Sequence, residues 1–339
     1  KDAASINQGG LKMPIVVNSN ASATEASFNL SRNNEALRKS LGRLSSGKRI
    51  NNPADDAGGL AVAYKLNSTI NRSYATIQNA QNALSYLQVQ DSALATVGKI
   101  LDRMAELRTM AQDITKNSGD IENYSKEFLE LQNQLRQVKE EKFNGISLFS
   151  ISGSDVAGSK AQLTQDSAGV YVDAAGATQT YTKYGRELIT HPSGNTGNGS
   201  ISLNVVNLQF VLSLNGSANA NINLGGINNT AGSIAATAMG GDNYITNIRD
   251  VSVSEFINAI EKLADARAEN GAEQNRIMNS INLLQTNVTN LEAAHGRIMD
   301  ADIALESTRF ARYNVLVQAS AAMTAQANQM TNIALSLLG

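Results

Sequence analysis

Apolar residues recur every three or four positions near the start of the chain, and this spacing predicts a helix over residues 22–44. Its stripe includes Leu37, Leu41 and Leu44. Gly47 follows a pair of serines and suits the left-handed end of a helix. Pro53 then lacks an amide donor and interrupts any continuation, so Asp55 or Asp56 is expected to cap a second helix.

The second predicted helix is long, because apolar residues continue at helical spacing from Leu66 to Met104. A mean spacing near 3.5 residues is typical of a seam that faces another helix. This seam includes Leu94, Val97 and Leu101. Polar residues and a glycine at 117–120 break the pattern, and a shorter return helix is predicted before the Phe143-Asn144-Gly145 turn.

The most regular seam lies towards the other end of the chain, where the steps are 4, 3, 4 and 3. Its members are Ile277, Ile281, Leu284, Val288 and Leu291. Extended backward, the same steps reach Gln274, Asn270 and Arg267. Polar layers of this kind can fix the register of paired helices, and the alternative is that the helix bends or turns its face there. A last helix contains Leu335 and Leu338.

The middle of the chain, 151–249, differs from both ends because glycine, asparagine, serine and threonine dominate it. Short runs at 169–173, 179–184 and 200–214 have β-branched or alternating residues. These runs predict a small non-helical, β-rich domain with long loops, and the alternative is that part of the segment is disordered. The predicted fold class is therefore mainly α, with long antiparallel helices and a small β-rich insertion.

Composition and charge narrow the possible functions. The 339 residues include no cysteine, so disulfides and metal–thiolate sites are excluded. A net charge of -2 without a lysine- or arginine-rich run argues against a nucleic-acid partner. No stretch approaches the length of a transmembrane helix, and the start lacks the layout of a secretory signal. Residues 1–12 are interpreted as an extension or tag before Met13.

Candidate catalytic chemistry is sparse. The chain has 2 histidines and none of the common hydrolase, zinc-protease or phosphate-loop motifs. His191 precedes a proline in a predicted turn. His295 continues the seam that runs from Ile277 to Leu291, and it is expected to be a packed or interface residue. Asp55 and Asp56 fit helix capping better than metal binding. We therefore expect no enzyme activity, no metal site and no cofactor.

Specific motifs at both ends of the chain resemble those of bacterial flagellins. Residues 44–63 read LSSGKRINNPADDAGGLAVA, and the last residues, 326–339, read QANQMTNIALSLLG. Between them, Gln274-Asn275-Arg276 and the run from Arg297 to Asp302 also agree. Two long ends that match in the same order make this resemblance specific.

The resemblance implies a helical polymer built from copies of the chain. Residues 13–56 and 296–339 would pair as a coiled coil lining an inner tube, 57–150 and 250–295 would form a surrounding helical bundle, and 151–249 would face outward. The assembly seam is then expected to comprise Leu37, Leu41, Leu44, Leu94, Val97, Leu101, Ile277, Ile281, Leu284, Val288, Leu291, Leu335 and Leu338. Flagellins often carry a proline in the final segment, so its absence here predicts a more continuous last helix.

The resemblance also implies a set of partners. These are an export chaperone, the flagellar type III export apparatus, and the hook-associated and cap proteins, with the filament outside the cell. Some flagellins contact a Toll-like receptor, and Arg103, Leu107 and Glu130 match the contacting positions. The competing interpretation is that Arg103 pairs with Glu130 and that Leu107 packs between subunits. Alternative functions are a hook–filament junction protein, or an adhesin or enzyme carried by the outer domain.

Overall fold

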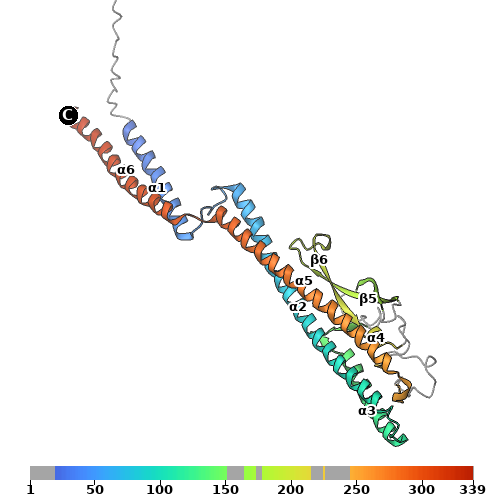
Figure 1. Ribbon diagram of the computed structural model, residues 1–339. Coiled ribbons are helices and arrows are strands. Elements are labelled where there is room, and N and C mark those ends of the chain that lie inside the picture. The colour runs from blue at the N-terminus through green and yellow to red at the C-terminus, as the bar shows by residue number, and fades with distance from the viewer. Residues whose placement is uncertain (1–19, 151–163, 173–177, 215–223, 226–244, 339) are drawn as a thin grey trace, which may run out of the picture. The chain divides into compact units, whose positions relative to one another are not determined.

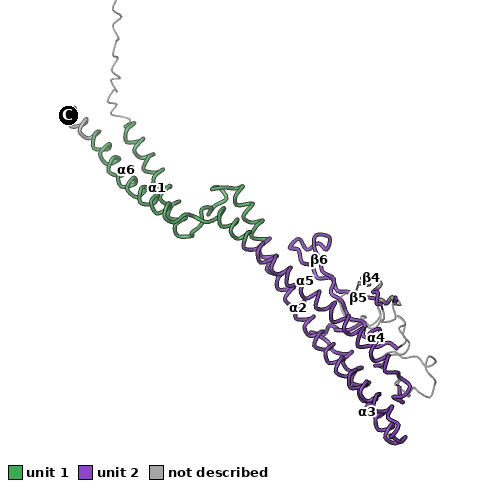
Figure 2. Tube along the Cα trace, viewed as in Figure 1, with its two compact units in different colours: residues 1–68, 290–339 green, residues 69–289 purple. Residues whose placement is uncertain are grey.

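The computed structural model describes residues 20–150, 164–172, 178–214, 224–225 and 245–338. The expected extension at 1–12 and much of the middle segment lie outside these residues. The chain divides into two compact units, one formed by residues 1–68 and 290–339 and the other by 69–289 (Figure 2). Each end of the sequence therefore contributes to the first unit, as the pairing of the two ends requires.

The first unit is built around two helices, α1 (Ala21–Ser46) and α6 (Ile303–Leu338), which lie side by side (Figure 1). Gly47 ends α1 with φ 70°, and its amide donates to Arg43 O, so the predicted left-handed helix end is confirmed. The expected continuous last helix is also confirmed, since α6 extends over 36 residues.

Two aspartates begin the helices that follow the breaks. Asp56 accepts the Gly59 amide at 2.8 Å at the start of α2 (Ala57–Met110), and Asp302 accepts the Leu305 amide at 3.1 Å at the start of α6. The sequence did not decide whether Asp55 or Asp56 caps α2, and in the structure the cap is Asp56.

The second unit is a helical bundle of α3 (Ser118–Lys139) with most of α2 and most of α5 (Val253–Met299), whose residues 57–68 and 290–299 belong to the first unit. Asn117 and Asp120 form a reciprocal capping box at the start of the return helix. Phe128 of α3 packs edge-to-face on Phe256 of α5, and neither is exposed. Most buried apolar residues of the described chain belong to this unit.

A short hairpin follows α3. Strand β1 (Lys142–Phe143) pairs antiparallel with β2 (Ile146–Ser147). The connecting Asn144 and Gly145 have φ values of 49° and 78°. An Asn-Gly pair accepts this left-handed geometry readily, which explains why the return helix is followed by a tight turn.

The outer sheet contains four strands in the order β3-β6-β5-β4. They are β3 (Phe149–Ser150), β4 (Thr164–Val172), β5 (Thr178–Ile189) and β6 (Ser200–Asn207). β4 pairs antiparallel with β5, β5 pairs antiparallel with β6, and β3 runs parallel to β6. The predicted β-rich middle is thus confirmed where the structure describes it.

The predicted strand over 200–214 is too long, and the expectation of a wholly non-helical middle is wrong. Strand β6 ends at Asn207, whose side chain accepts the Phe210 amide and caps α4 (Leu208–Val211). Two short 3-10 turns, η1 (Thr196–Asn198) and η2 (Ile248–Asp250), also lie in 151–250. The apolar run was misread because an asparagine cap inside it outweighs β propensity.

Candidate assembly surface

Several polar contacts join α1 and α6. The antiparallel contacts of this pair include Asn20 Nδ2 donating to Ala327 O at 2.7 Å and Asn33 Nδ2 donating to Ser320 Oγ at 2.8 Å. Among the described side chains at 21–46 and 303–330, only Ser40, Glu306 and Ala327 are buried. The two helices therefore have almost no apolar core of their own.

Large apolar side chains instead project from the outer faces of this pair. Phe28 of α1 is 68% exposed, and Val315 and Met323 of α6 are each 64% exposed. Other exposed members of this set are Leu41, Ile303, Leu305, Leu316 and Met330. We call these residues the exposed apolar set. Surface of this kind indicates a protein–protein contact.

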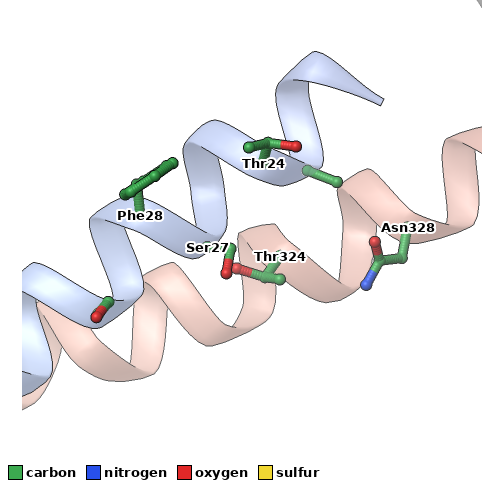
Figure 3. Close-up of a pocket in the computed structure, with 7 residues that line it drawn as sticks. Thr24, Ser27, Phe28, Thr324 and Asn328 are labelled. Carbon is green, nitrogen blue, oxygen red and sulfur yellow. The ribbon is translucent and has the colours of Figure 1, made fainter. Parts of the chain in front are cut away.

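An open groove of about 510 Å³ runs between the two helices near the start of α1. Ser27 and Thr324 lie between the helices, whereas Phe28 lies over α1 (Figure 3). The other lining residues are Ala23, Thr24, Ser31 and Asn328. The groove is thus lined by small polar groups beside one large exposed ring.

The leucines predicted for assembly in the first and last helices occupy different surroundings. Leu37 and Leu44 are half-buried, whereas Leu41 is 51% exposed. Leu335 and Leu338 belong to α6, but their side chains lie outside the described part of the structure. Leu37 and Leu44 are therefore partly covered within the first unit, and Leu41 lies on the surface.

The other predicted seam residues lie in the helical bundle. Those that are buried within the single chain are Leu94, Val97, Leu101, Ile277, Ile281, Leu284 and Val288. Leu291, in the first unit, is half-buried. In the single chain these buried residues contribute to the subunit's own core.

Two polar contacts to the buried Glu306 carboxylate stabilise the first unit. Ser40 Oγ donates to Glu306 Oε1 at 2.6 Å, and Arg309 lies 3.4 Å from the same carboxylate. Burying Glu306 is tolerated because both oxygens gain a polar neighbour. The Ser40–Glu306 pair was not predicted, since no local pattern links a serine of α1 to a glutamate 266 residues later.

The segment between α1 and α2 is tied to α1 through Asp55. Lys39 Nζ lies 2.6 Å from Asp55 Oδ1, and the Asn51 and Asn52 amides donate to Oδ2 at 3.3 Å. The hydrogen bond from Lys39, more than any other contact, lowers the pKa of Asp55 to about 2. Asp55 was predicted as a possible cap, but its role is to fold this segment.

The same segment also pairs with the break between α5 and α6. The Ala301 amide donates to Gly47 O at 2.9 Å, and the Arg49 amide donates to Met299 O at 2.6 Å. The Arg49 guanidinium also donates to Ile298 O at 2.8 Å and 3.1 Å. The two breaks in the sequence therefore meet as one joint in the first unit.

The positions matched to a receptor contact lie on α2 and α3. Arg103 donates to Glu127 at 2.7 Å and lies 3.1 Å from Glu106. The expected pairing of Arg103 with Glu130 is wrong, because Glu127 one turn earlier takes that place and Glu130 is exposed. Leu107 is fully buried inside the single subunit.

The residues considered for catalysis have ordinary structural surroundings. His191 Nδ1 accepts the Ser193 amide at 3.1 Å in an exposed turn, as predicted, and His295 is half-buried. Within the described residues, no group of acidic, histidine or cysteine side chains has the arrangement of a metal site. None of the described helices combines the length and apolar character needed to cross a membrane.

Comparison with known proteins identifies both helical ends. Residues 17–154 match the bacterial flagellin N-terminal helical region, and residues 253–338 match the bacterial flagellin C-terminal helical region. Together these matches cover more than half of the chain. They leave out the glycine- and asparagine-rich middle.

Full-length relatives agree with these matches. Flagellin of Bacillus subtilis (strain 168) is 31% identical over 95% of this chain and 99% of that protein. The flagellar filament 33 kDa core protein of Treponema phagedenis is 28% identical over 96% of this chain and 100% of that protein. The crystal structure of Bacillus cereus flagellin is 22% identical and covers 64% of this chain and 94% of its own, with a TM-score of 0.37, too low to support an argument. The chain therefore belongs to the bacterial flagellin family, and it is a structural subunit of the flagellar filament.

Proposed function

We propose that the exposed apolar set of α1 and α6 is the surface through which copies of this chain polymerise. The observation that carries this proposal is the near absence of an apolar core between two long helices that expose Phe28, Val315 and Met323. Burial of such side chains against neighbouring copies provides the missing hydrophobic stabilisation. A contact repeated by rotation and rise generates an open helical filament.

The proposed arrangement in the filament places 13–56 and 296–339 in an inner tube. Residues 57–150 and 250–295 form the bundle around it, and 151–249 face outward. The polar joints and exposed apolar residues of α1 and α6 support the inner position, because an interior tube can cover several faces of each helix at once. The bundle buries its apolar core within one chain, which supports a position around the tube where fewer of its faces are covered by other subunits.

We propose an export route and partners, which family membership supports. The subunit is exported through the flagellar type III apparatus under the guard of a chaperone, and it meets the hook-associated and cap proteins at the filament outside the cell. The absence of cysteine suits a chain that passes between compartments. We propose no membrane insertion, no nucleic-acid partner and no cofactor.

The role is structural rather than enzymatic. Ser193 Oγ lies 2.7 Å from His191 Nδ1, but both side chains are exposed, and the same imidazole nitrogen accepts the Ser193 amide within the turn. The junction-protein and adhesin alternatives are not favoured by the flagellin relatives. A receptor contact is a second proposal, and the exposed Arg103 and Glu130 side chains support it. Leu107 has no exposed surface in the single subunit, so its part in such a contact is indirect.

Seeded growth followed by electron microscopy and hydrogen exchange tests the assembly proposal. Purified protein is dissociated by heat, mixed with short filament seeds, and imaged. Long filaments are expected, and amides of 13–50 and 300–339 should exchange rapidly in free subunits but slowly in filaments. Strong protection of both ends before assembly would refute the proposal, and capped or absent polymers would favour a junction protein.

A further inference from the structure

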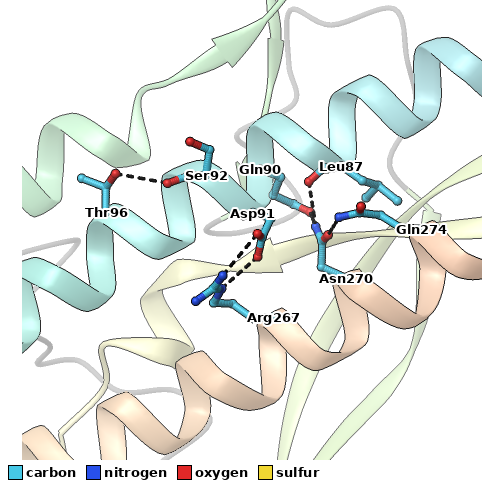
Figure 4. Close-up of polar contacts among 8 residues, drawn as sticks. All are labelled: Leu87, Gln90, Asp91, Ser92, Thr96, Arg267, Asn270 and Gln274. Atoms are coloured by element: carbon cyan, nitrogen blue, oxygen red, sulfur yellow. Dashed lines mark hydrogen bonds and ion pairs between the residues drawn. The ribbon is translucent and has the colours of Figure 1, made fainter.

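Two buried side-chain amides interrupt the apolar seam between α2 and α5. Gln90 of α2 is 0% exposed and Asn270 of α5 is 2% exposed. Asn270 Nδ2 donates to Gln90 Oε1 at 2.7 Å and to Leu87 O at 3.2 Å, and its Oδ1 accepts from Gln274 Nε2 at 2.6 Å (Figure 4). Since α5 is one helix from Val253 to Met299, this polar layer is part of the seam and does not mark a break.

Gln90 also binds the outer sheet. Its Nε2 donates to Leu148 O at 2.8 Å and to Asn204 O of β6 at 3.2 Å. Both hydrogens of each amide therefore have an acceptor, and both amide oxygens have a donor. A completely satisfied buried network is rigid, because any displacement leaves a polar group unpaired away from water.

The neighbouring face of the same turn of α5 holds the sheet as well. Glu273 accepts the Asn204 amide at 3.0 and 3.1 Å, and Glu269 accepts Asn204 Nδ2 at 2.7 Å. Lys183 of β5 lies 2.9 Å from Glu269. This part of α5 thus binds α2 through Asn270, whose oxygen Gln274 of the same helix supports, and it binds the sheet through Glu269 and Glu273.

We propose that Gln90 and Asn270 form a register lock. They fix the axial alignment of α5 on α2, and they hold the outer sheet in the position that this alignment requires. The apolar seam residues around them are interchangeable in kind, so a shift of one heptad would still bury apolar side chains. Such a shift, about 10 Å along the axis, would bury both amides without their partners. The lock acts within one chain and does not depend on polymerisation.

The lock can be tested in free subunits with pairs of nitroxide labels. The chain has no cysteine, so a single pair can be introduced at exposed sites. Gln88→Cys with Asn275→Cys reports the α2–α5 register, and Gln88→Cys with Glu187→Cys reports the position of the sheet. The parent is expected to give one narrow distance for each pair.

The test variant is Gln90→Leu with Asn270→Leu, which removes both amides together. It should keep its helical content but show a second, resolved distance for both label pairs, as an axial shift of about 10 Å requires. The second pair shifts with the first because the sheet follows α5 through Glu269 and Glu273. The matched control is Asp91→Ala with Arg267→Ala, which removes an exposed ion pair at the same level of the seam. That control should keep one distance.

A folded Gln90→Leu, Asn270→Leu variant with the parent's single distances would overturn the proposal. If the double variant does not fold, Asn270→Leu alone provides the test, since it leaves both bonds from Gln90 to Leu148 and Asn204 in place. A second Gln88–Asn275 distance in a smaller fraction of molecules is then expected. One unchanged distance in that variant contradicts the lock equally.

Discussion

The α1–α6 pair and the α2–α3–α5 bundle place their apolar side chains in opposite ways. In the bundle, residues such as Leu94, Leu101 and Phe256 are fully buried within one chain. In the described part of the α1–α6 pair, the buried side chains are two polar residues and one alanine, while Phe28 and Val315 face solvent. Periodic apolar positions therefore do not have one meaning within this molecule.

This difference separates folding from assembly. A helix that buries its stripe inside the subunit is stabilised before any other copy arrives. A helix pair joined by contacts such as Ser40–Glu306 has its partner specified by polar groups and keeps its apolar surface for other copies. The comparison predicts that substitutions in the two regions will have separable effects on subunit stability and on polymer growth.

The largest expected effect is loss of filaments when a charge enters the exposed apolar set. Val315→Asp should abolish seeded growth, because burying an unpaired carboxylate costs several kcal/mol, and about 1.4 kcal/mol already weakens association tenfold. Unfolding of the free subunit should change by no more than about 0.5 kcal/mol. Growth is measured by electron microscopy and stability by thermal unfolding.

Asn314→Asp is the control for this experiment, since it adds the same charge at the preceding exposed position of α6, where the side chain is already polar and of similar size. It should reduce growth less than Val315→Asp. Filaments of Val315→Asp that grow at the parent rate would remove this face of α6 from the assembly surface.

A core truncation should show the reverse pattern. Leu101→Ala is expected to lower the free energy of unfolding of the free subunit by about 2–5 kcal/mol, while still permitting growth at low temperature. Leu41→Ala removes an exposed side chain of the same size and should leave the free subunit nearly unchanged. Equal destabilisation by both variants in urea unfolding would show that the α1–α6 pair has a core in the free subunit.

Replacing two glycines with alanine should change stability by smaller amounts and in opposite directions. Gly47 has φ 70°, so Gly47→Ala should lower filament stability by about 1–2 kcal/mol through backbone strain. Gly271 lies inside α5, and a Cβ added there would meet no atom within 4 Å, so Gly271→Ala should stabilise the bundle by about 0.5–1 kcal/mol. Thermal dissociation of filaments and unfolding of subunits measure the two effects. A gain from Gly47→Ala would contradict the left-handed helix end.

The smallest effect concerns pH. Because the folded pKa of Asp55 is lowered from 3.8 to about 2, its contribution to stability is present above pH 3.8 and is lost as pH falls towards about 2. Asp55→Asn and Lys39→Met should both flatten the pH dependence of filament melting in this window. Asp102→Asn, which removes an exposed carboxylate from α2, should not. Identical pH profiles for Asp55→Asn and the parent would exclude the Lys39 contact.

Local signals in the sequence were sufficient for the ends of most helices. Gly47, Asp56, Asp302 and Asn117 each lie where backbone geometry or a nearby amide requires that residue type. Contacts between distant residues were not predictable in the same way. The choice of Glu127 over Glu130 for Arg103 depends on how far α3 is rotated on α2, and helical spacing permits both.

The sequence by itself determined the long helices, their breaks, the β-rich middle and, through motifs at both ends, the family. These features depend on neighbouring residues and on periodicity, which a single chain displays directly. Only the tertiary structure decided which apolar stripes are core and which are surface, and that one turn of α5 binds both α2 and the outer sheet. The physical reason is that burial and hydrogen-bond partners depend on the elements that meet in space, and the spacing along one element does not specify its neighbour.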